Sequence, residues 1–178
     1  MAISRTSQVY IQIAACTKEL TEGAVFSCDP SIGSSSSMPG WAVYIQGKYV
    51  ASGTIDLPRT KPIPDRLKTL ARELTKLYSK YPCDVLVYEE IPAQRHGMGN
   101  ANAHASLLKA LGVILSVSGP EHTVGIMPVS WKPLISEQYQ KGDEADAIEI
   151  GRIVIDQAYI QQEEAKNGKS VTKKATKN

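Results

Sequence analysis

The sequence predicts an α/β domain in which helices flank a mixed sheet. Short apolar runs alternate with amphipathic stretches in the order βββαβαβα, and a hairpin turn joins two of the first three strands. The 178 residues suffice for one domain with its own hydrophobic core. With 42% hydrophobic and 21% charged residues, the composition is that of a globular protein, which excludes a collagen, a coiled coil and a wholly disordered chain.

Five strands are expected. Residues 24–29 form an apolar run that ends in an acid, which is typical of a buried strand. Residues 40–46 and 48–57 are rich in β-branched and aromatic residues, and the Gln-Gly pair at their junction favours a hairpin. The first three strands are therefore expected to be antiparallel neighbours. Two later apolar runs, residues 83–90 and 123–129, complete the sheet.

Three helices are expected. Residues 64–81 carry leucines at a spacing of three to four, with Pro in the first turn and Lys near the end. Residues 101–117 are apolar on most sides, which indicates burial in the monomer or at a dimer interface. Residues 143–164 form a long C-terminal helix. These elements are assigned to one domain, residues 23–164.

Both ends of the chain lie outside this domain. Residues 1–22 are interpreted as an N-terminal extension, in which the alternation of SQVYIQIAA is compatible with a strand. Residues 165–178 contain five Lys and no acid, and we expect a basic, disordered tail; a nucleic-acid-binding arm is the alternative. The rest of the chain has 15 basic and 18 acidic residues, so a nucleic-acid partner would meet an acidic body.

The cysteines and the hydropathy of the sequence indicate where in the cell the protein is expected. Three cysteines without a CxxC pair argue against a disulfide framework or a thiolate zinc site and favour a reducing environment. No apolar run reaches the roughly 18 residues of a membrane span, and the first residues lack the pattern of a signal peptide. We therefore expect no membrane association and an intracellular location: the cytoplasm, the host cytoplasm for a viral protein, or an organelle matrix.

Acidic residues stand at the ends of the expected elements. Asp29 ends the first strand, Glu89 and Glu90 end the fourth, and Asp143 and Asp146 share one face of the last helix. Sites in α/β sheets form at the carboxyl ends of strands, so pairing of the first and fourth strands would bring these acids together. Clustered carboxylates repel one another unless cations bind them, and oxygen ligands without His or Cys suit Mg²⁺ or Mn²⁺. Two such ions about 4 Å apart serve phosphodiester hydrolysis.

Each acid also has a purely structural interpretation. Asp29 precedes Pro30, and Asp-Pro is a common start of a turn. A Glu pair at a strand end is often only solvated. Asp143 follows Gly142 and is a suitable helix N-cap, while Asp146 suits the positive end of the helix dipole. The predicted metal site therefore depends on the four acids occurring together.

Several short motifs occur in the same order as in the RuvC-type Holliday-junction resolvases. They cover residues 24–160 and read CDP, GWAV, VYEEIP, SLLKALGV, PVSWK and KGDEADAI, the last being the most specific. The chain resembles a divergent member of this family. The resemblance implies a ribonuclease H-like mixed five-stranded sheet flanked by helices, and a homodimer that packs through residues 101–117. It also implies that two metal ions per site are held by four catalytic acids: Asp29, Glu89, Asp143 and Asp146.

Three cationic residues are candidates for DNA contacts. Lys132 matches a Lys that touches the DNA backbone in the resolvase family. Arg95 is a candidate because a guanidinium group suits phosphate oxygens. The family's second DNA-contacting Lys has no clear match in this sequence, and Lys141 is named as a candidate for it. The chain departs from the family in its longer, Ser-rich loop after Asp29 and in Pro92, which stands where bacterial enzymes have an aromatic residue that opens the junction.

The expected function is that of a structure-selective DNA endonuclease. It would resolve four-way or branched DNA in recombination and repair by paired, metal-dependent phosphodiester hydrolysis, as a crossover-junction endodeoxyribonuclease. One alternative is a nucleotide-binding ATPase with a similar core fold, which would need Gly-rich phosphate loops that SIGSSSS does not convincingly supply. The other is a catalytically silent module that binds branched DNA, against which the four intact acids argue.

Overall fold

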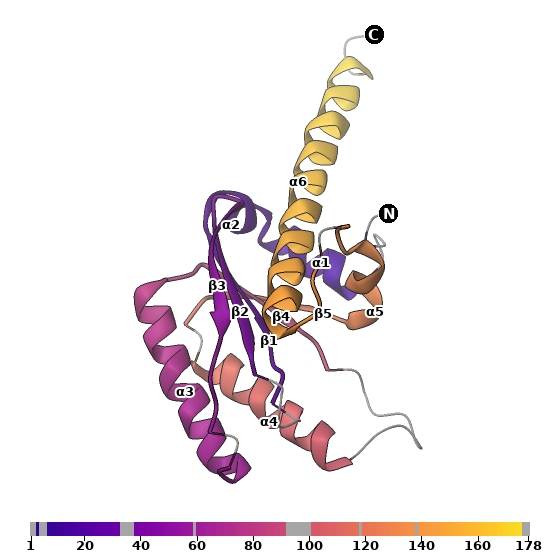
Figure 1. Cartoon of the computed structure of the whole chain (residues 1–178). Helices are drawn as coiled ribbons and strands as arrows, with labels where there is room; N and C mark the ends of the chain where they lie inside the picture. Colours follow the sequence, from indigo (N-terminus) through magenta and orange to yellow (C-terminus); the bar gives the residue numbers. More distant parts are fainter. Residues whose placement is uncertain are drawn as a thin grey trace.

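A computed structural model describes residues 3, 7–32, 38–58, 60–91, 101–117, 119–137 and 139–175. Its centre is one five-stranded sheet with the strand order β3-β2-β1-β4-β5 (Figure 1). The sheet and its flanking helices agree with the predicted α/β class. The strands are β1 (Ala24–Asp29), β2 (Gly40–Ile45), β3 (Lys48–Thr54), β4 (Val85–Glu89) and β5 (His122–Ile126).

The strand directions decide where the acids lie. The strands β1, β2 and β3 form an antiparallel meander, while β4 runs parallel to β1 and β5 runs parallel to β4. The predicted hairpin is confirmed, with positive φ at Gln46 and Gly47, the geometry that a tight turn with right-handed strand twist requires. Because β1, β4 and β5 are parallel, their carboxyl ends share one edge of the sheet.

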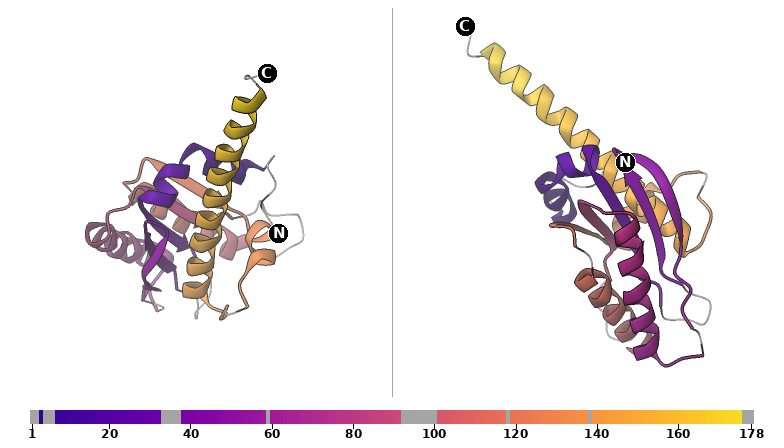
Figure 2. Two further views of the ribbon diagram at one scale, coloured as in Figure 1. Left: turned by 90° about the horizontal axis from the view of Figure 1, so that it is seen from above. Right: turned by 90° about the vertical axis from the view of Figure 1, so that its left-hand side faces the viewer.

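Helices cover both faces of the sheet (Figure 2). On one face lie α3 and α4, which enclose a core of Phe26, Leu70, Leu86 and Ile114 with other apolar side chains. The other face is covered by α1, α2, the short α5 and α6. The expected helices 64–81 and 101–117 are confirmed. The bounds are α1 (Gln8–Ala15), α2 (Thr17–Glu22), α3 (Ile63–Lys80), α4 (Ala101–Val117), α5 (Pro128–Trp131) and α6 (Asp143–Ala175).

The N-terminal segment differs from the expectation. The stretch that was compatible with a strand forms α1, and α2 follows it. The apolar residues that become buried recur every three to four positions, which is the helical period, and they are Val9, Ile13, Cys16 and Leu20. These side chains belong to the same hydrophobic cluster as α6 and the sheet. The two helices are therefore part of the core layer on this face.

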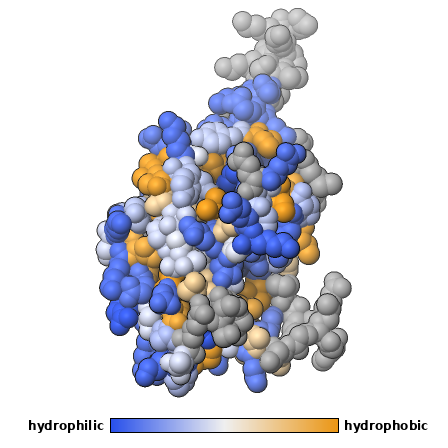
Figure 3. Space-filling model, viewed as in Figure 1, coloured by the Kyte–Doolittle hydropathy of each residue, from blue (hydrophilic) through white to orange (hydrophobic). Residues whose placement is uncertain are grey.

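The last helix is longer than the sequence pattern predicts. The helix α6 continues beyond residue 164 to Ala175, so it includes most of the segment expected to be disordered. Its 33 residues correspond to about 50 Å, and its distal part stands away from the body (Figure 1). Where α6 leaves the body, its surface is hydrophilic (Figure 3). No helix in the described part of the chain is both long and apolar enough to cross a membrane.

Two glycines let α6 approach the sheet closely. A Cβ atom at Gly151 would lie 2.6 Å from Cε2 of Tyr44 and 2.7 Å from Oγ of Ser27. A Cβ atom at Gly40 would lie 1.8 Å from the carbonyl oxygen of Asp143. A side chain at Gly40 would collide with the backbone at the start of α6, and one at Gly151 would collide with the side chains of Tyr44 and Ser27. The start of α6 therefore rests directly on β2.

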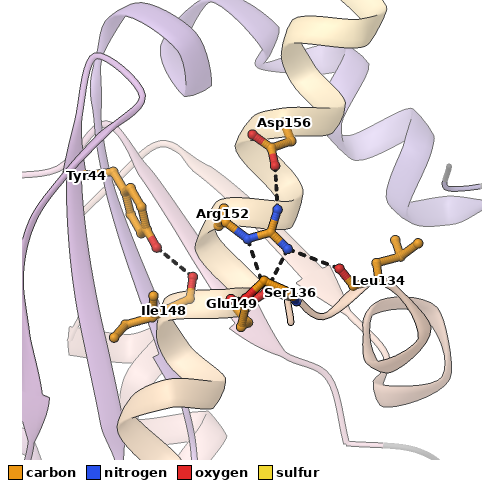
Figure 4. Close-up of polar contacts among 7 residues, drawn as sticks. All are labelled: Tyr44, Leu134, Ser136, Ile148, Glu149, Arg152 and Asp156. Carbon is orange, nitrogen blue, oxygen red and sulfur yellow. Dashed lines mark hydrogen bonds and ion pairs between the residues drawn. The ribbon is translucent and has the colours of Figure 1, made fainter. Parts of the chain in front are cut away.

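Hydrogen bonds fix the helix in this position. The hydroxyl of Tyr44 donates to the carbonyl oxygen of Ile148 over 2.6 Å (Figure 4), and the hydroxyl of Ser27 donates to that of Ala147 over 2.7 Å. Both acceptors lie in the first two turns of α6. The sheet thus determines the position of the helical segment that carries the two predicted catalytic aspartates.

Candidate metal and DNA-binding site

Four acidic side chains come together at the carboxyl edge of the sheet. Asp29 is the last residue of β1 and Glu89 the last of the parallel neighbour β4, so the two strands end side by side. Asp29 also pairs with Gly40 on β2, and Gly40 is the residue against which Asp143 rests. Asp146 follows one turn later on α6. The close approach of α6 to the sheet is what joins the two pairs of acids.

The electrostatics of Asp29 reflect this convergence. Asp29 is only 6% exposed, and its pKa is raised to about 8, with burial as the largest cause. The carboxylates of Glu89, Asp143 and Asp146 contribute to this rise, in that order, whereas a hydrogen bond from Ser31 opposes it. A buried carboxyl group beside three other acids is unfavourable in its charged form unless a cation compensates the charge.

Each of the other three acids accepts a hydrogen bond from the protein. The indole Nε1 of Trp131 donates to Oε2 of Glu89 over 3.1 Å. The hydroxyl of Tyr139 donates to Oδ1 of Asp146, and the backbone N–H of Met38 donates to Oδ2 of Asp143 over 2.8 Å. Burial and the bond to Asp146 raise the pKa of Tyr139, so its hydroxyl remains a donor. These contacts orient the carboxylates individually.

The donor set fits a hard divalent cation in its chemistry. All four ligands would be carboxylate oxygens, as Mg²⁺ and Mn²⁺ prefer, and a bound cation would offset the mutual repulsion that helps to raise the pKa of Asp29. Within the described residues, however, no group of three or more Asp, Glu, His or Cys side chains is gathered closely enough to hold an ion as it stands.

Two of the predicted DNA-binding lysines line the same cavity as two of the four acids. This cavity has a volume of about 440 Å³, and its lining includes Lys132, Lys141, Asp143 and Asp146. The ammonium group of Lys132 lies 5.5 Å from the ring centre of Trp131. Burial raises the pKa of Glu89, and the charge of Lys132 opposes that rise, as does the hydrogen bond from Trp131. The third candidate, Arg95, lies outside the described residues, as do Pro92 and the Ser-rich loop.

No protein-family model and no curated protein matches the chain. Solved structures do match. RuvC of Thermus thermophilus in complex with a Holliday junction substrate is similar with a TM-score of 0.59 and 16% identity, covering 78% of this chain and 95% of that chain. The yeast mitochondrial Holliday junction resolvase Ydc2 is similar with a TM-score of 0.58 and 13% identity, covering 92% and 93%. The chain has the fold of the RuvC-type resolvases.

Within this RuvC-type fold, the two neighbouring glutamates at the end of β4 differ in environment. Glu89 is half-buried, accepts the bond from Trp131 and acts on the pKa of Asp29. Glu90 is exposed, and its charge acts on the pKa of Tyr88 instead. The geometry therefore favours Glu89 as the member of the acidic cluster.

Sequence reasoning missed a set of contacts that holds the segment after β5 against α6. The buried carboxylate of Glu149 accepts hydrogen bonds from the backbone N–H and the hydroxyl of Ser136, at 3.2 and 2.8 Å, and pairs with Arg152 at 2.7 Å. Arg152 also pairs with Asp156 and donates to the carbonyl oxygen of Leu134 (Figure 4). The segment held in this way carries Lys132, Trp131 and Tyr139.

The signals for these contacts in the sequence are incomplete. The spacing of Glu149, Arg152 and Asp156 on one helix face is a recognisable pattern of ion pairs. Their contact with Ser136 is not visible in any local pattern. Trp131 is fully buried, and a buried indole N–H needs an acceptor, which here is Glu89.

The raised pKa of Asp29 predicts how the stability of the metal-free protein depends on pH. The folded protein binds the carboxyl proton with a pKa of about 8, compared with the usual 3.8. Between these values the folded state holds the proton more tightly than the unfolded state, so stability is lost as the pH rises through this range. We expect Asp29→Asn to be more stable than the wild type at pH 7 in EDTA by at least about 1 kcal/mol, with the difference vanishing near pH 4.

Denaturant unfolding across this pH range measures the effect. Glu90→Gln is the matched control, because this neighbouring acid is exposed and its removal should change stability little. Parallel pH profiles for the wild type and Asp29→Asn would contradict the prediction.

Proposed function

We propose that this protein is a structure-selective DNA endonuclease that resolves four-way (Holliday) or branched DNA by paired, metal-dependent phosphodiester hydrolysis. The observation that carries the proposal is the meeting of Asp29, Glu89, Asp143 and Asp146 at one edge of a RuvC-type sheet. The likeness to a resolvase solved in complex with a Holliday junction supports the choice of substrate. This activity is that of a crossover-junction endodeoxyribonuclease.

The carboxylates define the chemistry that the site would support. Asp29, Glu89, Asp143 and Asp146 would hold two Mg²⁺ or Mn²⁺ ions, which when bound lower the pKa of a water nucleophile and stabilise the leaving oxygen. Trp131 and Tyr139 hydrogen-bond to two of these acids and limit the orientations of their carboxylates.

The lysines beside the acids would bind the substrate. Lys132 and Lys141 line the cavity that is also lined by Asp143 and Asp146. A phosphodiester group bound in this cavity would therefore lie between the lysines and the aspartates. Their ammonium groups attract the phosphate, and they offset part of the negative charge of the acids. We propose that these two lysines, together with Arg95, hold the DNA backbone at the site of cleavage.

A homodimer would supply the second cut that a four-way junction needs. The helix α4 exposes a stripe of small and apolar residues at alternating spacings of four and three: Ala101, Ala105, Leu108, Gly112 and Leu115. This spacing is typical of two helices that pack along a common seam. Among the residues that the structure describes, nothing lies within 4 Å of a Cβ atom placed at Gly112, so a second helix has room to approach. We propose that a second copy of the chain covers this stripe.

Replacing an exposed residue of the stripe tests the dimer. Leu108 is 48% exposed, so Leu108→Asp should leave the fold intact and convert dimers into monomers that nick a junction on one strand without resolving it. Ile114 is unsuitable because it is fully buried within the monomer. Light scattering at micromolar concentration measures the mass, and Lys18→Asp, at an exposed position of α2 on the opposite face of the sheet, is the control. A wild-type monomer bound to a junction would overturn the proposal.

One set of assays tests the function as a whole. The protein is incubated with a synthetic four-way junction and Mg²⁺, and the same sample is incubated with ATP. Symmetric cuts near the crossover, without ATP turnover, are the expected result. ATP hydrolysis without cleavage would favour the nucleotide-binding alternative, and junction binding without cleavage would favour a catalytically silent module.

A further inference from the structure

A second cavity adjoins the one that is lined by Asp143 and Asp146. It has a volume of about 670 Å³, within the range of ligand-binding sites, and lies between β3, the first turns of α6 and the residues that precede α6. Four residues line both cavities: Tyr139, Lys141, Gly142 and Asp143. A group bound in the second cavity would therefore lie directly beside a phosphate bound at the acids.

The walls of this cavity combine aromatic, hydroxyl and carboxylate groups. On the β3 side, Tyr49 is 55% exposed, and its hydroxyl lies 2.8 Å from the hydroxyl of Ser52. Ser52 in turn donates to Oε1 of Glu144 on α6 over 2.5 Å. This bridge holds the carboxylate of Glu144 against β3, on the same side as the hydroxyl of Tyr49. A carboxylate has about four lone-pair sites, so Glu144 can accept further hydrogen bonds.

The charges of the lining favour a nucleobase over another phosphate. Glu144 and Asp143 are negative, while Lys141 is the one basic residue among the lining residues that the structure describes. The charge of Glu149 is already compensated by Arg152. An additional phosphate would be repelled by this surplus of negative charge. A base is neutral, and it could stack on an exposed aromatic ring and donate an amino hydrogen to a carboxylate.

We propose that this cavity binds the nucleobase next to the cleaved phosphate and that Glu144 determines which base is preferred there. The inference rests on the proposed nuclease function and adds a specificity-determining residue to it. Adenine and cytosine carry an amino donor where thymine carries the O4 acceptor, and a carboxylate pairs with donors only. Thymine should therefore be disfavoured at one position beside the cut.

A junction library with randomised bases around the crossover provides the test. It is cleaved with Mg²⁺ and sequenced for the wild type, Glu144→Gln, Glu144→Asp and a control, Glu137→Gln, which removes an exposed carboxylate outside this cavity. We expect the wild type to cut adenine or cytosine at least about fivefold faster than thymine at one flanking position. The amide of Glu144→Gln can donate as well as accept, so the preference should vanish, while Glu144→Asp and Glu137→Gln should retain it.

A binding measurement separates stacking from base selection. Tyr49→Ala should weaken junction binding in Ca²⁺ to a similar degree for every base and leave the preference in cleavage unchanged. Equal cutting of all bases by the wild type, or a preference that survives Glu144→Gln, would overturn the inference while leaving the nuclease function in place. Failure to cut any sequence would overturn the proposed function, and the inference with it.

Discussion

Asp29→Asn and Asp146→Asn are each expected to slow junction cleavage by about 10²-fold or more while leaving junction binding intact. The amide keeps the shape of the side chain but removes the negative charge that would hold a divalent ion. A misplaced ion no longer activates the water in line with the phosphodiester bond. Binding should persist or tighten, because the surface that faces the DNA loses negative charge. Parallel cleavage and gel-shift assays measure the two effects.

The two adjacent glutamates of β4 supply a matched pair of variants for this experiment. Glu89→Gln should lose cleavage as the aspartate variants do, whereas Glu90→Gln, at an exposed position, should retain most of it. Replacing Mg²⁺ with Ca²⁺ should permit binding without cutting, since the looser coordination of Ca²⁺ does not maintain the required geometry. Wild-type cleavage by Asp146→Asn would refute the site of four acids, while the reverse result for the glutamates would refute only the choice between them.

Ile13→Ala is expected to lower the free energy of unfolding by about 2–5 kcal/mol. The side chain is 0% exposed and belongs to the hydrophobic cluster that joins α1 to the sheet and α6. Ile11, on the same helix, is 56% exposed, so Ile11→Ala should change stability by no more than about 0.5 kcal/mol. Denaturant unfolding of the two variants measures the difference. Equal effects would show that α1 does not contribute to the core.

The strands and the two middle helices could be predicted because their signals are local. Apolar runs bounded by turn residues marked the strands, and the period of the leucines marked α3. The N-terminal helices could not be predicted in this way, since the stretch QVYIQIAA fits an alternating pattern as well as a helical one. Contacts with residues about 150 positions away decide between them, such as the bond from Gln161 to the carbonyl oxygen of Tyr10.

The four acids could be proposed from the sequence because they end strands or begin a helix, and the topology determines where such ends meet. Their hydrogen-bonding partners could not. Tyr139 lies in an irregular segment without a period, and its approach to Asp146 depends on the path of residues 132–139. That path depends in turn on Glu149 and Ser136, which no local pattern connects.

The absence of a side chain at Gly151 has an evolutionary consequence. A methyl group there would collide with Tyr44 and Ser27 and would move α6, together with two of the acids, away from the sheet. Homologous chains with a larger residue at this position should therefore carry a smaller one at the position of Tyr44 or Ser27. None of these three residues bears a charge or lines a cavity at the acids. If they are substituted together among homologues, the reason would be selection that keeps Asp143 and Asp146 on α6 at a fixed distance from Asp29 and Glu89 on the sheet.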